Sequence, residues 1–318
     1  YVENYAILFP AIVLYMLLAL RSATKPGHLW LTSAYLGLLI PVHLSMVTLL
    51  PSLFLLPWLG SRAAGFDWRP LVRGLLACLS AAIAALVLFT LLGFDLSRPS
   101  GALRASPILP LTWDPGPTYP YGLLSPGHLV ELANQYLLSA PAAIVLLLIP
   151  LWRLPDLRST MFVAASTLFP VMSTVVGNPT IGAFRDWDVA AFSALPLTLF
   201  SGLVLLRWFA DDRNLKPAAM LVLAASTLHT TSWVVTNAIP ASAEARFEDL
   251  LVRSNMAGHA RSVALESLGA YHLERNRPRR ALDAYLALAS VDPEFAEAHY
   301  NIGNVRHTLG DVDGAVTS

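Results

Sequence analysis

The sequence predicts an all-α protein in which a bundle of membrane-spanning helices is followed by an α-solenoid of short helical repeats. Three observations lead to this fold class. The composition is 55% hydrophobic and only 13% charged, whereas ordinary soluble domains have about 25% charged residues. Apolar runs long enough to cross a bilayer recur along the chain, and the last one ends before Pro240. After residue 241, small and apolar residues return with a period of 34, which is typical of stacked helical hairpins.

Charge and cysteine content narrow the range of partners. The formal net charge is zero, so nothing indicates a nucleic acid partner, and membrane lipids are the expected surroundings. The single cysteine, Cys78, lies in an apolar run and cannot form a disulfide within the chain. On this basis we expect no zinc site, no other metal and no cofactor. Charge also separates the chain into a transmembrane domain, 1–240, and a solvated repeat domain, 241–318.

Apolar segments and their breaks define the expected spans. The run over 29–59 contains Pro41 and Pro51, and proline interrupts a helix. We therefore expect two pieces that meet at Pro41–His43 and enclose a polar cleft, because broken helices at membrane depth need protein or water around them. The last span should begin with Pro217 in its first turn. The predicted spans are 5–20, 29–40, 43–59, 71–94, 125–152, 160–176, 187–208 and 217–239.

Arginine and lysine positions predict the orientation. Most of those in the loops lie in the turns 21–28, 60–70, 153–158 and 207–216, which favours the cytoplasm for these turns. The protein is then a multi-pass protein of a bacterial inner membrane, with the repeat domain on the extracytoplasmic side. The chain lacks an initial methionine and stops at Ser318 within a predicted helix, so we expect it to be part of a longer protein.

The repeat becomes visible when the sequence after residue 262 is aligned with itself at an offset of 34 residues. Leu268-Gly269 falls on Ile302-Gly303, and Ala264 and Ala281 fall on Ala298 and Ala315. The stretch Ala296-Glu-Ala-His-Tyr-Asn-Ile-Gly-Asn resembles the first helix of the tetratricopeptide (TPR) repeat. The resemblance covers 262–318 and implies a concave surface that binds a protein or peptide partner. The alternative is a generic amphipathic helical hairpin.

Three polar stretches in the apolar part are candidate sites. The first is Arg185-Asp186-Trp187-Asp188, where Arg185 can hold a phosphate through its two-pronged guanidinium. The alternative is an interfacial anchor, in which Trp187 lies in the aromatic belt and Asp186 and Asp188 lie near a helix N-terminus.

The second stretch is His43-Leu-Ser45 at the Pro41 break. His43 can contact a polar head group or move a proton, although the simpler interpretation, that it satisfies backbone carbonyls freed at the break, is favoured. The third stretch holds His128, Glu131 and Asn134 at a spacing of three residues. This spacing suggests a metal or acid–base pair, but a solvated helix end is favoured because no third ligand or HExxH pattern accompanies it.

A broken apolar body followed by extracytoplasmic repeats resembles the GT-C membrane glycosyltransferases of the protein O-mannosyltransferase-like kind. The stretches that carry this resemblance are Gly37-Leu-Leu-Ile-Pro-Val-His-Leu-Ser-Met-Val-Thr-Leu-Leu-Pro51 and Asn178-Pro-Thr-Ile-Gly-Ala-Phe-Arg-Asp-Trp-Asp188. The resemblance implies transfer of a sugar from a polyprenyl-phosphate donor to an external acceptor. It implies a donor-phosphate contact for Arg185, with Asp186 and Asp188 as neighbours. It also places the catalytic carboxylate upstream of Tyr1, so no catalytic residue is assigned in this chain. The competing function is a non-catalytic, membrane-anchored TPR scaffold or assembly subunit.

Overall fold

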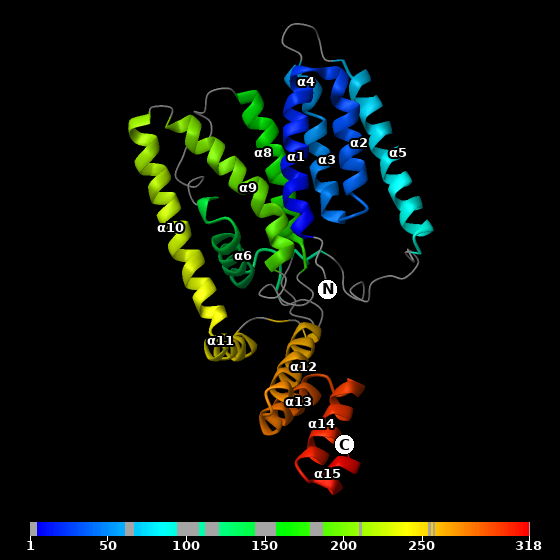
Figure 1. Cartoon of the computed structure of the whole chain (residues 1–318), viewed down its shortest axis with the longest axis vertical. Helices are drawn as coiled ribbons and strands as arrows, with labels where there is room; N and C mark the ends of the chain where they lie inside the picture. Colours follow the sequence, from blue (N-terminus) through cyan, green and yellow to red (C-terminus); the bar gives the residue numbers. More distant parts are fainter. Residues whose placement is uncertain are drawn as a thin grey trace. The chain divides into compact units, whose positions relative to one another are not determined.

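A computed structural model shows a helical protein, as the fold class predicts (Figure 1). Within the part of the chain that the structure describes there is no strand, and only an isolated antiparallel bridge joins Ile108 to Gly177. The described residues are 5–60, 67–93, 108–111, 121–143, 157–178, 187–209, 212–253, 256 and 258–317.

The chain divides into two compact units. The bundle unit comprises 1–100, 132–176 and 187–233, and the hairpin unit comprises 101–131, 177–186 and 234–318. The division falls within two helices, α6 (Pro126–Ser139) and α10 (Asp212–Ala238). The predicted domain boundary at residue 240 lies seven residues after the last boundary between the units, and it stays a prediction.

The bundle unit is built on close helix packing. Helix α2 (Leu29–Leu39) packs along α5 (Arg69–Leu91), and α1 (Tyr5–Thr24) packs on α2. Figure 1 shows these three helices side by side with similar axis directions. At Gly37 a Cβ atom would collide with the backbone carbonyl of Cys78, so the α2–α5 contact requires glycine there. The buried core continues into the helices that follow α2, and it includes Leu8, Ile12, Tyr15, Leu36, Met46, Leu49, Leu53 and Phe162.

The predicted break at Pro41 is confirmed. Helix α2 ends at Leu39, and His43 is extended before the 3-10 helix η2 (Leu44–Leu49). The second piece is not one helix over 43–59, because η2 is followed by the short helices α3 (Leu50–Leu53) and α4 (Leu56–Gly60). Two prolines explain this division: Pro51 occupies the first turn of α3 and Pro57 that of α4, where a missing N–H costs nothing.

Two other span boundaries differ from the prediction. Helix α6 ends at Ser139 rather than near residue 152, because Pro141 opens the 3-10 helix η4 (Pro141–Ala143). Helix α10 begins at Asp212, so Pro217 lies inside it and not in its first turn. Helices α8 (Leu157–Val176) and α9 (Trp187–Trp208) match the predicted spans closely. Among the described residues, three helical segments are long and apolar enough to cross a membrane: Arg69–Leu91, Ala191–Trp208 and Arg213–Ala238.

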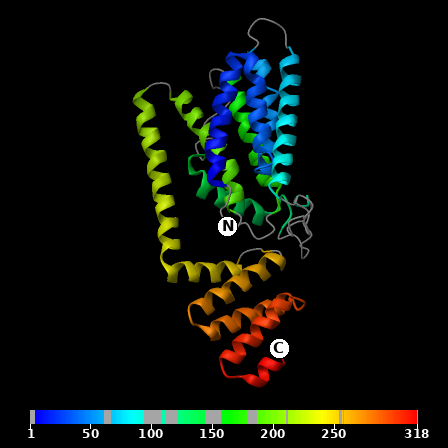
Figure 2. The same ribbon diagram turned by 45° about the vertical axis from the view of Figure 1, so that its right-hand side comes forward.

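The hairpin unit ends in a series of short helices that pack in sequence (Figure 2). Their bounds are α11 Pro240–Arg253, α12 Gly258–Glu274, α13 Pro278–Val291, α14 Ala296–Thr308 and α15 Val312–Val316. A shared core joins them, with Leu251 from α11, Tyr285 and Leu288 from α13, and Ile302 from α14. The expected packing of 244–252 on the first hairpin is therefore confirmed.

The turns between helices repeat at the offset of 34 that the sequence predicts. Arg277 N–H donates to His272 O at 2.9 Å, and at the equivalent place Asp311 N–H donates to Arg306 O at 2.9 Å. Asn276 has a φ of 56° and its equivalent, Gly310, has a φ of 84°. A left-handed residue at this position is a common way to end a helix. The two hairpins therefore share turn geometry as well as sequence.

Candidate functional site

The structure describes only part of the predicted Arg185–Asp188 site. Arg185 and Asp186 lie outside the described residues. Asp188 is the second residue of α9, and its side chain is not described. The geometry of the site is therefore built from the side chains that follow Asp188 on α9 and from the residues that contact them.

His43 contacts α9 close to its start. The imidazole stacks on the ring of Phe192, with centroids 6.1 Å apart and planes 17° from parallel. Phe192 lies one helical turn after Asp188 and is fully buried. Two stretches that the sequence marks independently, the Pro41 break and the start of α9, are thus adjacent in the bundle unit.

The local geometry assigns the proton of His43. Ser45 N–H donates to His43 Nδ1 at 3.3 Å, so Nδ1 is the unprotonated nitrogen and Nε2 carries the proton of the neutral ring. His43 therefore caps the start of η2 through a backbone N–H. The favoured sequence interpretation, a bond from His43 to freed carbonyls, stays a prediction; the capping bond satisfies the backbone N–H of Ser45.

A hydroxyl cluster next to Phe192 was missed by sequence reasoning. Ser193 Oγ lies 2.9 Å from Tyr136 Oη of α6 and accepts a hydrogen bond of 3.0 Å from Thr174 of α8. Single serine and threonine residues in apolar helices give no sequence signal, because their hydroxyls usually bond their own helix. The cluster joins α6, α8 and α9 at Ser193, the residue that directly follows Phe192 of the His43–Phe192 stack.

The third predicted stretch forms a separate cluster in the hairpin unit. Tyr121 Oη donates to Glu131 Oε2 at 2.6 Å, and the Tyr121 ring lies 4.8 Å from the ring of His128. The favoured interpretation as a solvated helix end is wrong for His128, which is buried against Tyr121. Glu131 is half-buried, and Asn134 is exposed as expected. Ser125 caps α6 as predicted, accepting from His128 N–H at 3.3 Å.

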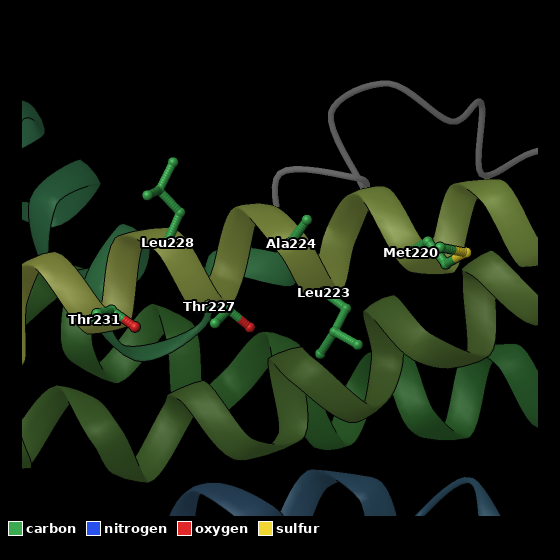
Figure 3. A pocket seen from close by; sticks show the side chains of 6 residues that line it. All are labelled: Met220, Leu223, Ala224, Thr227, Leu228 and Thr231. Carbon is green, nitrogen blue, oxygen red and sulfur yellow. The ribbon is translucent and has the colours of Figure 1, made fainter.

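A shallow apolar groove runs along α10. It is lined by six residues of that helix, shown in Figure 3: Met220, Leu223, Ala224, Thr227, Leu228 and Thr231. The groove contains no charged side chain among its lining residues, so its surface is suited to hydrocarbon or to another apolar helix rather than to a charged ligand.

One group of side chains has the donor types of a metal site. Glu244 and Glu248 of α11 and His272 of α12 place one ligand atom each within 4.8 Å of one another.

Comparison of the chain with protein-family models, with curated proteins and with solved structures found no match. Function is therefore inferred from the geometry and from the sequence resemblance alone.

Proposed function

We propose that the protein is a membrane glycosyltransferase-like protein that uses a polyprenyl-phosphate sugar donor. The observation that carries the proposal is the contact of His43 with Phe192, one turn after Asp188. It brings together the two stretches on which the resemblance to GT-C enzymes rests. The donor phosphate is assigned to Arg185, beside the start of α9, where backbone N–H groups favour an anion. Asp186 and Asp188 orient the guanidinium, and His43 is the candidate contact for the polar head group.

This function implies a multi-pass membrane protein. Three segments of sufficient length and apolarity support that location. The acceptor and the repeat domain then lie on the extracytoplasmic side, in agreement with the distribution of basic residues between loops. No carboxylate of this chain is assigned the role of activating the acceptor.

The test is donor binding by the full-length protein in nanodiscs, with a long-chain polyprenyl phosphate as the probe. A planar guanidinium fork is required for a bidentate contact, so Arg185→Lys should weaken binding almost as much as Arg185→Ala. A charge-assisted hydrogen bond contributes roughly 1.5–3 kcal/mol, which corresponds to about a ten- to hundred-fold loss of affinity. Arg213→Lys, in the first turn of α10, is the matched control. Unchanged binding by Arg185→Lys, as expected of an interfacial anchor, would reject the proposal.

The second candidate function is a membrane-anchored TPR scaffold that binds a protein or peptide partner. It is favoured by the turn geometry that recurs at an offset of 34 residues, since the repetition of hydrogen bonds and left-handed residues supports a TPR-type solenoid. The exposed Tyr300 and Asn304 of α14 line a groove together with Val312 and Val316 of α15. A selection of peptides on the full-length protein should yield ligands whose binding is lost in Tyr300→Ala. A scaffold without transferase activity should retain these ligands and show no saturable donor binding.

A further inference from the structure

A buried histidine on α12 faces two carboxylates on α11. His272 is 2% exposed, and its Nε2 lies 3.7 Å from Glu248 Oε1. Glu244 and Glu248 are four residues apart, so both side chains lie on the same face of α11. The nearest ligand atoms of all three residues lie within 4.8 Å of one another.

The imidazole of His272 makes no hydrogen bond within the part of the chain that the structure describes. Its Nδ1 is buried without a partner, and its Nε2 is beyond hydrogen-bond distance from Glu248. Its other recorded contact is an edge-on approach of the Tyr271 ring at 5.7 Å. The nitrogen that faces the carboxylates, Nε2, belongs to a buried side chain and has no hydrogen bond, and burying a polar atom without a partner is unfavourable. An ion held between Nε2 and the two carboxylates would provide that partner.

We propose that Glu244, Glu248 and His272 bind a divalent transition-metal ion, with Zn²⁺ as the best fit. An imidazole nitrogen with two carboxylate oxygens is a donor set that Zn²⁺ accepts, while Mg²⁺ and Ca²⁺ select oxygen ligands alone. The bound ion would join α11 to α12. The sequence-based exclusion of zinc considered cysteine only, and this donor set needs no cysteine.

Two arginines at the start of α13 hold the Glu244 carboxylate of this site through hydrogen bonds. Arg277 donates to both oxygens of Glu244 at 2.7 Å, and Arg280 donates to Oε1 at 2.6 Å. Carboxylates that bind metals are commonly held by such outer hydrogen bonds. Oε2 also accepts a long hydrogen bond of 3.4 Å from Tyr271, and this weak contact is the one that a metal ion would replace. The positive charge of Arg280 opposes the ion, and its removal should increase metal affinity.

The experiment is a titration of the detergent-solubilised full chain with Zn²⁺ by calorimetry and with Co²⁺ by visible absorption. One ion per chain is expected, with an increase in melting temperature because the ion binds only the folded state. Glu248→Gln should weaken binding by about ten-fold or more, and His272→Gln should abolish the Co²⁺ absorption bands. Arg280→Gln should bind more tightly. His299→Gln, a histidine on α14 that is not part of the group, is the matched control and should bind as the wild type does.

The Glu248 variant keeps the test independent of folding, because the Glu248 side chain is 45% exposed and its amide substitute leaves the core unchanged. Unchanged Zn²⁺ binding in Glu248→Gln would overturn the proposal. So would the absence of a saturable site in the wild type, or equal binding of Mg²⁺ and Zn²⁺. None of these outcomes affects the proposed donor site, which is assigned to Arg185 and is tested with a different ligand.

Discussion

The two units use glycine for close packing in different ways. In the bundle unit, Gly37 of α2 lies against the backbone of α5 at Cys78. In the hairpin unit, Gly269 of α12 lies under the ring of Tyr285, and a Cβ built on Gly269 would be 2.5 Å from Tyr285 Cε1. The first glycine brings two helix backbones together, whereas the second makes room for a large side chain.

The difference follows from the solvent that each unit is expected to meet. In lipid there is little hydrophobic force between apolar helices, so association depends on close backbone packing at small residues. In water the burial of an aromatic ring is itself strongly stabilising. The hairpin unit also holds its first helices together with charge, as in the Glu244 contacts with Arg277 and Arg280. Hydrogen bonds between helices of the bundle unit, in contrast, include pairs of hydroxyl groups, as in Tyr15–Ser52 and Ser22–Thr32.

The largest expected effect is that of Gly37→Ala. Because a Cβ at Gly37 meets a backbone carbonyl, which cannot rotate away, α2 and α5 must separate. We expect a loss of about 3 kcal/mol, at the upper end of overpacking effects. The measurement is thermal unfolding in detergent. Gly202→Ala is the matched control, since Gly202 on α9 has nothing within 4 Å of a built Cβ; helix propensity should leave it unchanged or slightly more stable. Equal melting temperatures for the two variants would contradict the backbone contact.

Gly269→Ala should have a smaller effect, because the group that it meets is a side chain. Displacement of the Tyr285 ring should lower the free energy of unfolding by roughly 1–2 kcal/mol. Tyr285→Leu is expected to be less destabilising in the Gly269→Ala background than alone, because the smaller side chain tolerates the added methyl group. Urea unfolding of the four proteins in a double-mutant cycle measures this coupling. Additive effects would show that Gly269 and Tyr285 do not share the space.

A pH-dependent effect should come from Glu244. The hydrogen bond from Arg277 is the main cause that lowers the pKa of Glu244 below its ordinary 4.5, with the charges of Arg277, His272 and Arg280 adding to it. A carboxyl whose pKa is lowered by folding stabilises the folded state above 4.5, and this stabilisation is lost as the pH falls through the lowered pKa. The melting temperature of the wild type should therefore fall more steeply below pH 4.5 than that of Glu244→Gln. Glu294→Gln, outside this ion-pair group, is the control, and parallel curves for Glu244→Gln and the wild type would refute the assignment.

The smallest expected change in stability comes from a substitution in the first of the two repeated turns. Asn276 has a left-handed backbone where the second turn has Gly310, and glycine adopts that conformation without steric cost. Asn276→Gly should therefore be stabilising by less than about 1 kcal/mol. Asn304→Gly makes the same change inside α14, where glycine lowers helix propensity, and should be slightly destabilising. The two shifts in melting temperature should have opposite signs, and shifts of the same sign would argue against equivalent turns.

Local sequence rules predicted the helices and breaks whose causes are local. Pro41 ended α2 as expected, Ser125 capped α6, and α11 begins at Pro240, directly after α10. The rules failed at Pro217, which was expected to mark the first turn of a helix. Pro217 is tolerated inside α10, because a single lost hydrogen bond did not prevent the preceding residues from forming helical turns.

The sequence by itself determined the all-helical class, the period of 34 residues and the stretches that carry unusual polar residues, because these depend on composition and on spacing along the chain. Only the tertiary structure decided which of those residues meet. The stack of His43 on Phe192, the link from Tyr136 to Ser193 and the approach of His272 to Glu248 join residues from different helices. No pattern along the chain encodes such pairs, since they depend on how helices that are apolar on several sides pack against one another.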